Sequence, residues 1–134
     1  MGKLDLLIVI VAAIAAWAAG AVYYMVLSRP WLAVSGVKVD NTGRPANASA
    51  APYIVSGIAM VVIAGMMRHM FEMASIDDLG KGLVSGLGIG AFIIAPWVVI
   101  NYIYAQRPTM LSLIDGGYAI LACTIIGTVL GATG

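Results

Sequence analysis

The stretch that decides the fold is Asn101–Tyr118, which reads NYIYAQRPTMLSLIDGGY. Long apolar runs lie on either side of it, and only Ala105–Thr109 separates them. A connection this short forces two helices to lie side by side and antiparallel. The sequence therefore predicts a helical hairpin that carries its polar side chains near the tip.

The composition around this hairpin is that of a membrane protein. Apolar residues make up 62% of the chain and charged residues 10%, and the mean hydropathy is +1.01, whereas about a quarter of the residues in soluble domains are charged. The formal net charge of +1 offers no basic surface to a nucleic acid. We therefore expect the lipid bilayer, and no nucleic acid, as the surroundings of the chain.

Four apolar runs cover most of the sequence, over about residues 4–27, 52–71, 83–104 and 110–132. Each is long enough to cross the hydrocarbon layer, which takes roughly 20 residues of helix. Strands are excluded because an open sheet leaves unpaired backbone groups in lipid. The sequence predicts an all-α integral membrane protein with a single domain over residues 1–134. A polar loop is expected over residues 28–51, with a short extended segment around Val37–Val39.

Basic residues indicate the orientation of the chain. The side of the hairpin tip holds four of them, Arg29, Lys38, Arg44 and Arg107, and the opposite side holds three, Lys3, Arg68 and Lys81. Cytoplasmic loops carry an excess of lysine and arginine. We therefore expect the tip in the cytoplasm and both termini outside.

The two halves of the chain share a register. Gly2-Lys3, Tyr24 and Arg29-Pro30 recur 78 residues later as Gly80-Lys81, Tyr102 and Arg107-Pro108. The first and third helices would then run parallel, as in transporters built from parallel repeats. A duplicated two-helix unit is one interpretation, and the chance sharing of helix-end residues is the other.

Small residues recur every four positions in three of the runs. They are Ala12, Ala16 and Gly20 in the first, Gly82, Gly86 and Gly90 in the third, and Gly127 and Gly131 in the fourth. Membrane helices associate largely by close backbone approach at such stripes. We expect these residues at helix–helix contacts, and we expect Pro96 to kink the third helix.

The polar residues that are energetically unfavourable inside a bilayer lie near the hairpin tip. Asp115 lies inside the fourth run, and a carboxylate at membrane depth is by default a candidate functional group. Asn101 and Tyr102 are expected at similar depth, with Arg107 at the tip. The sequence predicts a polar cluster of these four residues, either a functional site or a structural latch between helices, and we favour the latch.

The end of the second run offers the only metal-binding chemistry, and we expect no metal there. Met66, Met70 and Met73 share a helical face close to His69, and thioethers with imidazole are ligands that select Cu(I). One helix without a partner cysteine or second histidine makes a poor site, so methionine as apolar filler is the favoured interpretation. We also expect no other cofactor.

The segments AGAVYY at 19–24 and RPW at 29–31, with INY at 100–102, RP at 107–108 and DGGY at 115–118, resemble a known membrane family. It is the small bacterial family called domain of unknown function 1761. The resemblance covers nearly the whole chain and implies four membrane helices in a bacterial inner membrane. It implies no activity, because the family has none assigned.

No catalytic set is evident in the sequence. A Ser-His-Asp arrangement and paired buried carboxylates are missing, which argues against an enzyme. The favoured hypothesis is an accessory or assembly subunit of a larger membrane complex, in contact with other subunits or with copies of itself. The alternative is a homo-oligomeric transporter or channel for a small solute, with Asp115 and Asn101 in the path, and a membrane enzyme acting on lipids or quinones is a third.

Overall fold

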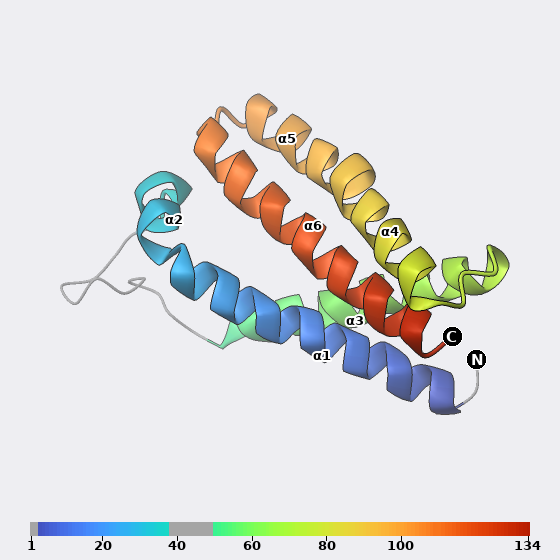
Figure 1. The fold of residues 1–134 in the computed structure, drawn as a ribbon. Helices are drawn as coiled ribbons and strands as arrows, with labels where there is room; N and C mark the ends of the chain where they lie inside the picture. Colours follow the sequence, from blue (N-terminus) through green and yellow to red (C-terminus); the bar gives the residue numbers. More distant parts are fainter. Residues whose placement is uncertain (1–2, 38–49) are drawn as a thin grey trace.

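The computed structural model describes residues 3–37 and 50–134, and every regular element there is helical. In chain order the elements are α1 Lys3–Val26, α2 Ser28–Ser35, α3 Ala51–Met73, α4 Leu79–Ile89, a π-helical turn η1 Gly90–Ile94, α5 Ala95–Tyr104 and α6 Thr109–Ala132 (Figure 1). The predicted all-α class is confirmed.

Four segments are long and apolar enough to cross a membrane, namely Asp5–Val26, Ala51–Met73, Leu79–Tyr104 and Thr109–Ala132. The third of these joins α4, η1 and α5 into one span. The spans run alternately up and down, so both ends of the chain lie at the same end of the bundle (Figure 1). This is the four-span arrangement that the hydropathy pattern predicts.

The predicted polar loop over 28–51 begins with a helix instead. Ser28–Ser35 forms α2, which ends at Gly36 with φ 78°. Pro30 fits in its first turn because the backbone N–H groups there have no helical acceptor, so proline loses nothing. Arg29 and Pro30 therefore lie in the first turn of α2. The extended segment expected around Val37–Val39 lies mostly outside the described residues.

Pro96 is accommodated by the wide turn that precedes it. The N–H of Ala95 reaches back five residues to the carbonyl of Gly90, and π-turns of this kind occur where a helix is disturbed. Proline has no N–H and its ring crowds the carbonyl four residues earlier, that of Phe92. The sequence-predicted kink is thus a single π-helical turn within a continuous span.

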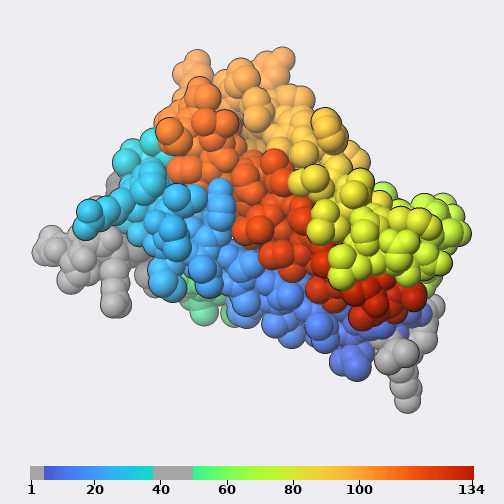
Figure 2. Space-filling view, viewed as in Figure 1, coloured from blue at the N-terminus to red at the C-terminus, as the bar shows by residue number. Residues whose placement is uncertain are grey.

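Helix α6 is the central element of the bundle. It packs against α1 on one side and against α4, η1 and α5 on the other, and Figure 2 shows it as a band between these neighbours. α3 packs mainly against α1 and less extensively against α6. The side chains of the core are small or aliphatic apart from Met67 and Phe71, and they include Ala12, Ala13, Ala16, Ala64, Ile126 and Leu130.

Glycines bring α4 and α6 into backbone contact. A Cβ atom on Gly86 would overlap the carbonyl of Cys123, and one on Gly82 would overlap the carbonyl of Gly127. A Cβ on Gly131 would likewise strike the carbonyl of Asp78. Gly90 continues this contact, since its Cβ would lie 2.6 Å from the Cα of Ile120. The glycines therefore lie where the backbones of α4 and α6 approach closely.

The two halves of the chain are parallel but not equivalent. α1 and the α4–α5 span run in the same direction on either side of α6 (Figure 1). If the halves packed alike, α3 would contact the α4–α5 span as extensively as α6 contacts α1, and it does not. The bundle is consequently less closed on the side between α3 and the α4–α5 span.

Candidate functional site

Asp115 is held by two tyrosines that come from two other helices. The hydroxyl of Tyr24 on α1 donates to Oδ1 at 2.6 Å, and the hydroxyl of Tyr102 on α5 donates to Oδ2 at 2.5 Å. Hydrogen bonds to an ionised acceptor are shorter and stronger than neutral ones. We call these three residues the tyrosine–carboxylate clamp. It ties α1, α5 and α6 together at one point.

The directions of the helices explain why these side chains meet. Helical side chains lean towards the N-terminus of their own helix. α1 and α5 end on the side of the membrane where α6 begins, so Tyr24 and Tyr102 lean inwards while Asp115 leans outwards. Asp115 is six residues beyond Thr109, which places it about 9 Å along α6. The three polar groups thus converge just inside the end of the bundle.

Two further tyrosines bind backbone carbonyls beside the clamp. The hydroxyl of Tyr23 donates to the carbonyl of Ile114 at 2.6 Å, and that of Tyr118 donates to the carbonyl of Ala16 at 2.9 Å. A buried tyrosine hydroxyl without a partner would be costly in an apolar environment. One bond runs from a tyrosine of α1 to the backbone of α6, and the other runs from a tyrosine of α6 to the backbone of α1.

Glycines make room for these two rings. A Cβ on Gly20 would lie 2.5 Å from the hydroxyl oxygen of Tyr118, and one on Gly117 would lie 2.7 Å from that of Tyr23. Neither distance is tolerable for a real carbon atom. Gly20, which the sequence assigns to helix packing, therefore packs against a tyrosine ring and not against a helix backbone.

The aromatic rings form one continuous group at this end of the bundle. Tyr24 contacts Tyr23, Tyr118 and Trp31 with ring centroids 5.2, 5.4 and 6.0 Å apart, all edge to face. Edge-to-face packing is a favoured geometry for aromatic pairs. Trp31 belongs to α2, so the short helix is attached to the bundle through this group.

The four residues of the predicted polar cluster have different positions. Tyr102 bonds to Asp115, while Arg107 donates through Nη2 to the carbonyl of Ser35 at the end of α2. Asn101 is exposed on α5, and no bond joins it to Asp115. Consecutive helical residues point about 100° apart, so Asn101 cannot face α6 when Tyr102 does. Arg107 instead lies at the C-terminal end of α2, where the partial negative charge of the helix dipole favours a cation.

Sequence reasoning did not identify Tyr24 as a partner of Asp115. The two residues are 91 positions apart. The available signal was the register shared by the two halves, because it pairs Tyr24 with Tyr102, a residue already assigned to the cluster.

The methionine face of α3 points away from the bundle. Met66, Met70 and Met73 are 58%, 38% and 75% exposed, and His69 is exposed as well. In the part of the chain that the structure describes, no three His, Cys, Asp or Glu side chains are grouped as metal ligands. The exposed thioethers are placed as lipid-facing filler would be.

A second polar contact lies near the opposite end of the bundle. Arg68 on α3 forms an ion pair of 2.7 Å with Asp5 on α1, and its Nε lies 3.4 Å from Glu72. The Arg68 side chain is only 11% exposed. This contact joins α1 and α3, as the clamp joins α1, α5 and α6.

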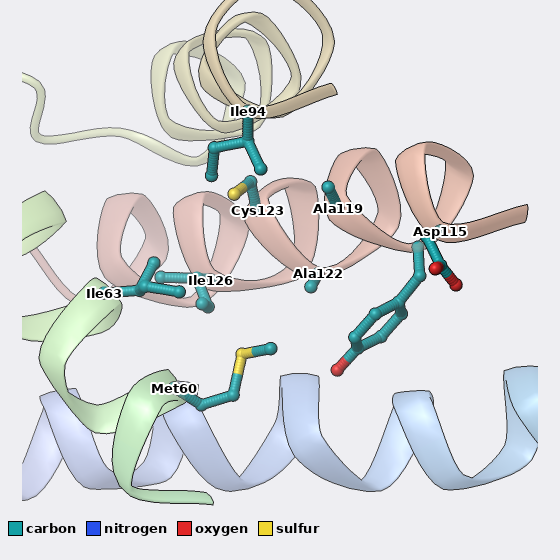
Figure 3. Close-up of a pocket in the computed structure, with 9 residues that line it drawn as sticks. Met60, Ile63, Ile94, Asp115, Ala119, Ala122, Cys123 and Ile126 are labelled. Carbon is teal, nitrogen blue, oxygen red and sulfur yellow. The ribbon is translucent and has the colours of Figure 1, made fainter. Parts of the chain in front are cut away.

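A cavity of about 120 Å³ lies between α3, η1 and α6 (Figure 3). Asp115 is at one end of it, and its oxygens point away from the cavity interior towards the start of α6. The lining residues are Met60, Ile63, Ile94, Asp115, Tyr118, Ala119, Ala122, Cys123 and Ile126. Asp115 thus belongs both to the clamp and to the wall of a largely apolar cavity.

Comparison with known proteins agrees with the resemblance seen in the sequence. Residues 7–131 match the family described as "Protein of unknown function (DUF1761)". No curated protein and no solved structure matches the chain. The matched region contains every residue of the clamp and of the cavity. The chain therefore belongs to the DUF1761 family.

Proposed function

We propose that the protein is a non-catalytic accessory or assembly subunit of a larger complex in the bacterial inner membrane. The observation that supports this most is the outward face of the Leu79–Tyr104 span. Only 11% of an apolar stretch of 18 residues in this span is buried inside the chain, compared with 39% of the corresponding stretch in α6. Large aromatic side chains are among the exposed ones: Phe92, Trp97 and Tyr104 are 81%, 64% and 86% exposed. Aromatic side chains are enriched at protein–protein interfaces.

The clamp supports a structural role for Asp115. Each carboxylate oxygen accepts a hydrogen bond from a tyrosine of another helix, which is how polar residues hold membrane helices together. Nucleophilic or acid–base chemistry would need a group free to reach a substrate. Asp115 therefore acts as the latch that keeps α1, α5 and α6 in register.

Photo-crosslinking in intact cells tests the partner. A photoreactive amino acid at Trp97 should give one discrete protein adduct, whereas the same residue at Val62, 66% exposed on α3, should give only lipid adducts. An adduct of twice the chain mass would indicate a homo-oligomer. Lipid adducts alone at both positions would contradict the proposal.

The proposed orientation places the α5–α6 turn in the cytoplasm and both termini outside. The test uses a Cys123→Ser background with single cysteines at Ala74, in the α3–α4 turn, and Ala105, in the α5–α6 turn. An impermeant maleimide applied to intact cells should label Ala74→Cys and not Ala105→Cys. The reverse pattern would invert the orientation.

A homo-oligomeric transporter or channel for a small solute is the second candidate. It is favoured by Asp115 at the end of a cavity, with no ion pair to a basic side chain among the described residues. Asn101 would then line a path between copies, because it faces outwards on α5. Solute flux in proteoliposomes should in that case be lost in Asp115→Asn and weakened in Asn101→Ala. Flux that survives Asp115→Asn would remove Asp115 from the path.

A further inference from the structure

The cavity beside the clamp has walls from three different elements. Met60 and Ile63 of α3 form one wall, Ile94 of η1 forms the opposite wall, and α6 forms the floor (Figure 3). It occupies the side of the bundle where α3 and the α4–α5 span pack least. The cavity is thus a consequence of the inequivalence of the two halves.

The size of the cavity limits what can enter it. Asp115 and Ile126, at its two ends, are eleven positions apart on α6, which corresponds to about 16 Å. The cavity has about 120 Å³. Its lining is long enough along α6 to follow a single extended chain.

The lining determines the polarity of the occupant. The hydroxyl of Tyr118 is bonded to the carbonyl of Ala16, and both oxygens of Asp115 accept tyrosine hydroxyls. The remaining lining residues are apolar, with Cys123 as a small, weakly polar one. The oxygens of Asp115 point away from the cavity interior, so the surface that faces an occupant is apolar. It complements an apolar ligand, since a polar group would lose its hydrogen bonds there.

We propose that this cavity binds one hydrocarbon chain of a bilayer lipid, which enters from the membrane between α3 and η1. The walls belong to three spans that cross the hydrocarbon layer, where lipid chains are the surrounding solvent. The chain fills the space that α3 leaves open and lies along α6 as far as Asp115. This binding site does not depend on the accessory role proposed above.

The test uses the full chain reconstituted in phosphatidylcholine vesicles that contain a phosphatidylcholine with a photoreactive diazirine in its acyl chain. Cys123 is 2% exposed and Trp97 is 64% exposed. Lipids at the outer surface can reach Trp97 and the exposed part of Met60, whereas only a chain in the cavity reaches Cys123. We expect labelling at Cys123 and Met60 comparable to that at Trp97.

Filling the cavity should remove this labelling selectively. In Ala119→Leu the labelling of Cys123 should fall by about fivefold, equivalent to about 1 kcal/mol, and that of Trp97 should be unchanged. Ile63→Trp fills the cavity from the opposite wall and should act alike. Ala18→Leu, on the exposed face of α1, is the matched control and should alter neither.

Two results would overturn the proposal. One is a lack of label at Cys123 in the unaltered chain, which needs no variant to interpret. The other is undiminished Cys123 labelling in a cavity-filling variant that elutes as a single species with unchanged helical circular dichroism.

Discussion

Tyr24 and Tyr102 hold opposite oxygens of one carboxylate, although they belong to helices from different halves of the chain. The two tyrosines occupy matching positions in the shared register, and α6 passes between their helices. The third member, Asp115, has no counterpart in the first half: the position 78 residues earlier is Val37. The clamp therefore joins a tyrosine that occurs in both halves of the register to an aspartate that occurs in only one.

Replacing the carboxylate should loosen the bundle. Asp115→Ala removes both acceptors and leaves two tyrosine hydroxyls unpaired, so we expect a loss of about 2 kcal/mol of stability. Thermal unfolding in mild detergent measures it. Asp77→Ala, in the exposed α3–α4 turn, is the control and should have no measurable effect. An unchanged melting temperature in Asp115→Ala would show that the clamp does not stabilise the fold.

The two tyrosines should be energetically coupled through Asp115. Tyr24→Phe and Tyr102→Phe each remove one hydrogen bond at a cost of about 1 kcal/mol. The double variant should differ from the sum of the two by about 0.5 kcal/mol or more, as expected for residues of one network. Tyr104→Phe, at an exposed ring, serves as the control. Strict additivity would mean that the two bonds act independently.

Neighbouring glycines of α4 should respond in opposite directions to alanine. Gly86→Ala drives a methyl group into the carbonyl of Cys123, so it should destabilise the chain by about 1–3 kcal/mol. Gly88→Ala meets no atom within 4 Å and should be neutral or stabilise by up to about 1 kcal/mol through helix propensity. Thermal unfolding of the two variants under identical conditions measures both changes in stability. Equal effects would contradict the contact between α4 and α6.

Removing Arg68 should separate α1 from α3 at the other end of the bundle. Arg68→Ala leaves Asp5 without its 2.7 Å ion pair, and the site is largely shielded, so a loss of about 1–2 kcal/mol is expected. Lys81→Ala is the control, because its side chain is 61% exposed and its ion pairs are 3.7 and 3.8 Å long. Exposed pairs of this kind contribute little. Limited proteolysis and thermal unfolding provide the readouts.

The spans were predictable because lipid imposes a single rule on every residue within them. Twenty or so apolar residues must form a helix, and the stripe of Gly82 and Gly86 identifies the face that meets α6. Asp115 was predictable as a special residue because of the cost of burying a carboxylate.

The partners of these residues were not predictable in the same way. Tyr24 reaches Asp115 through the packing of α1 on α6, which no local pattern specifies. Asn101 shares the depth of Asp115, but the helical rotation turns it outwards. Arg107 binds Ser35 because α2 exists, and α2 lies in the segment that the sequence predicts as a polar loop.

The position of the clamp also bears on the order in which the protein can be assembled. Its two donors lie on α1 and α5, whereas its acceptor is on α6, the last of these helices to leave the ribosome. Asp115 enters the bilayer at a cost, and the tyrosines of helices that have already been inserted offset it. The first and third spans thus offer the donors that Asp115 meets when α6 enters the membrane.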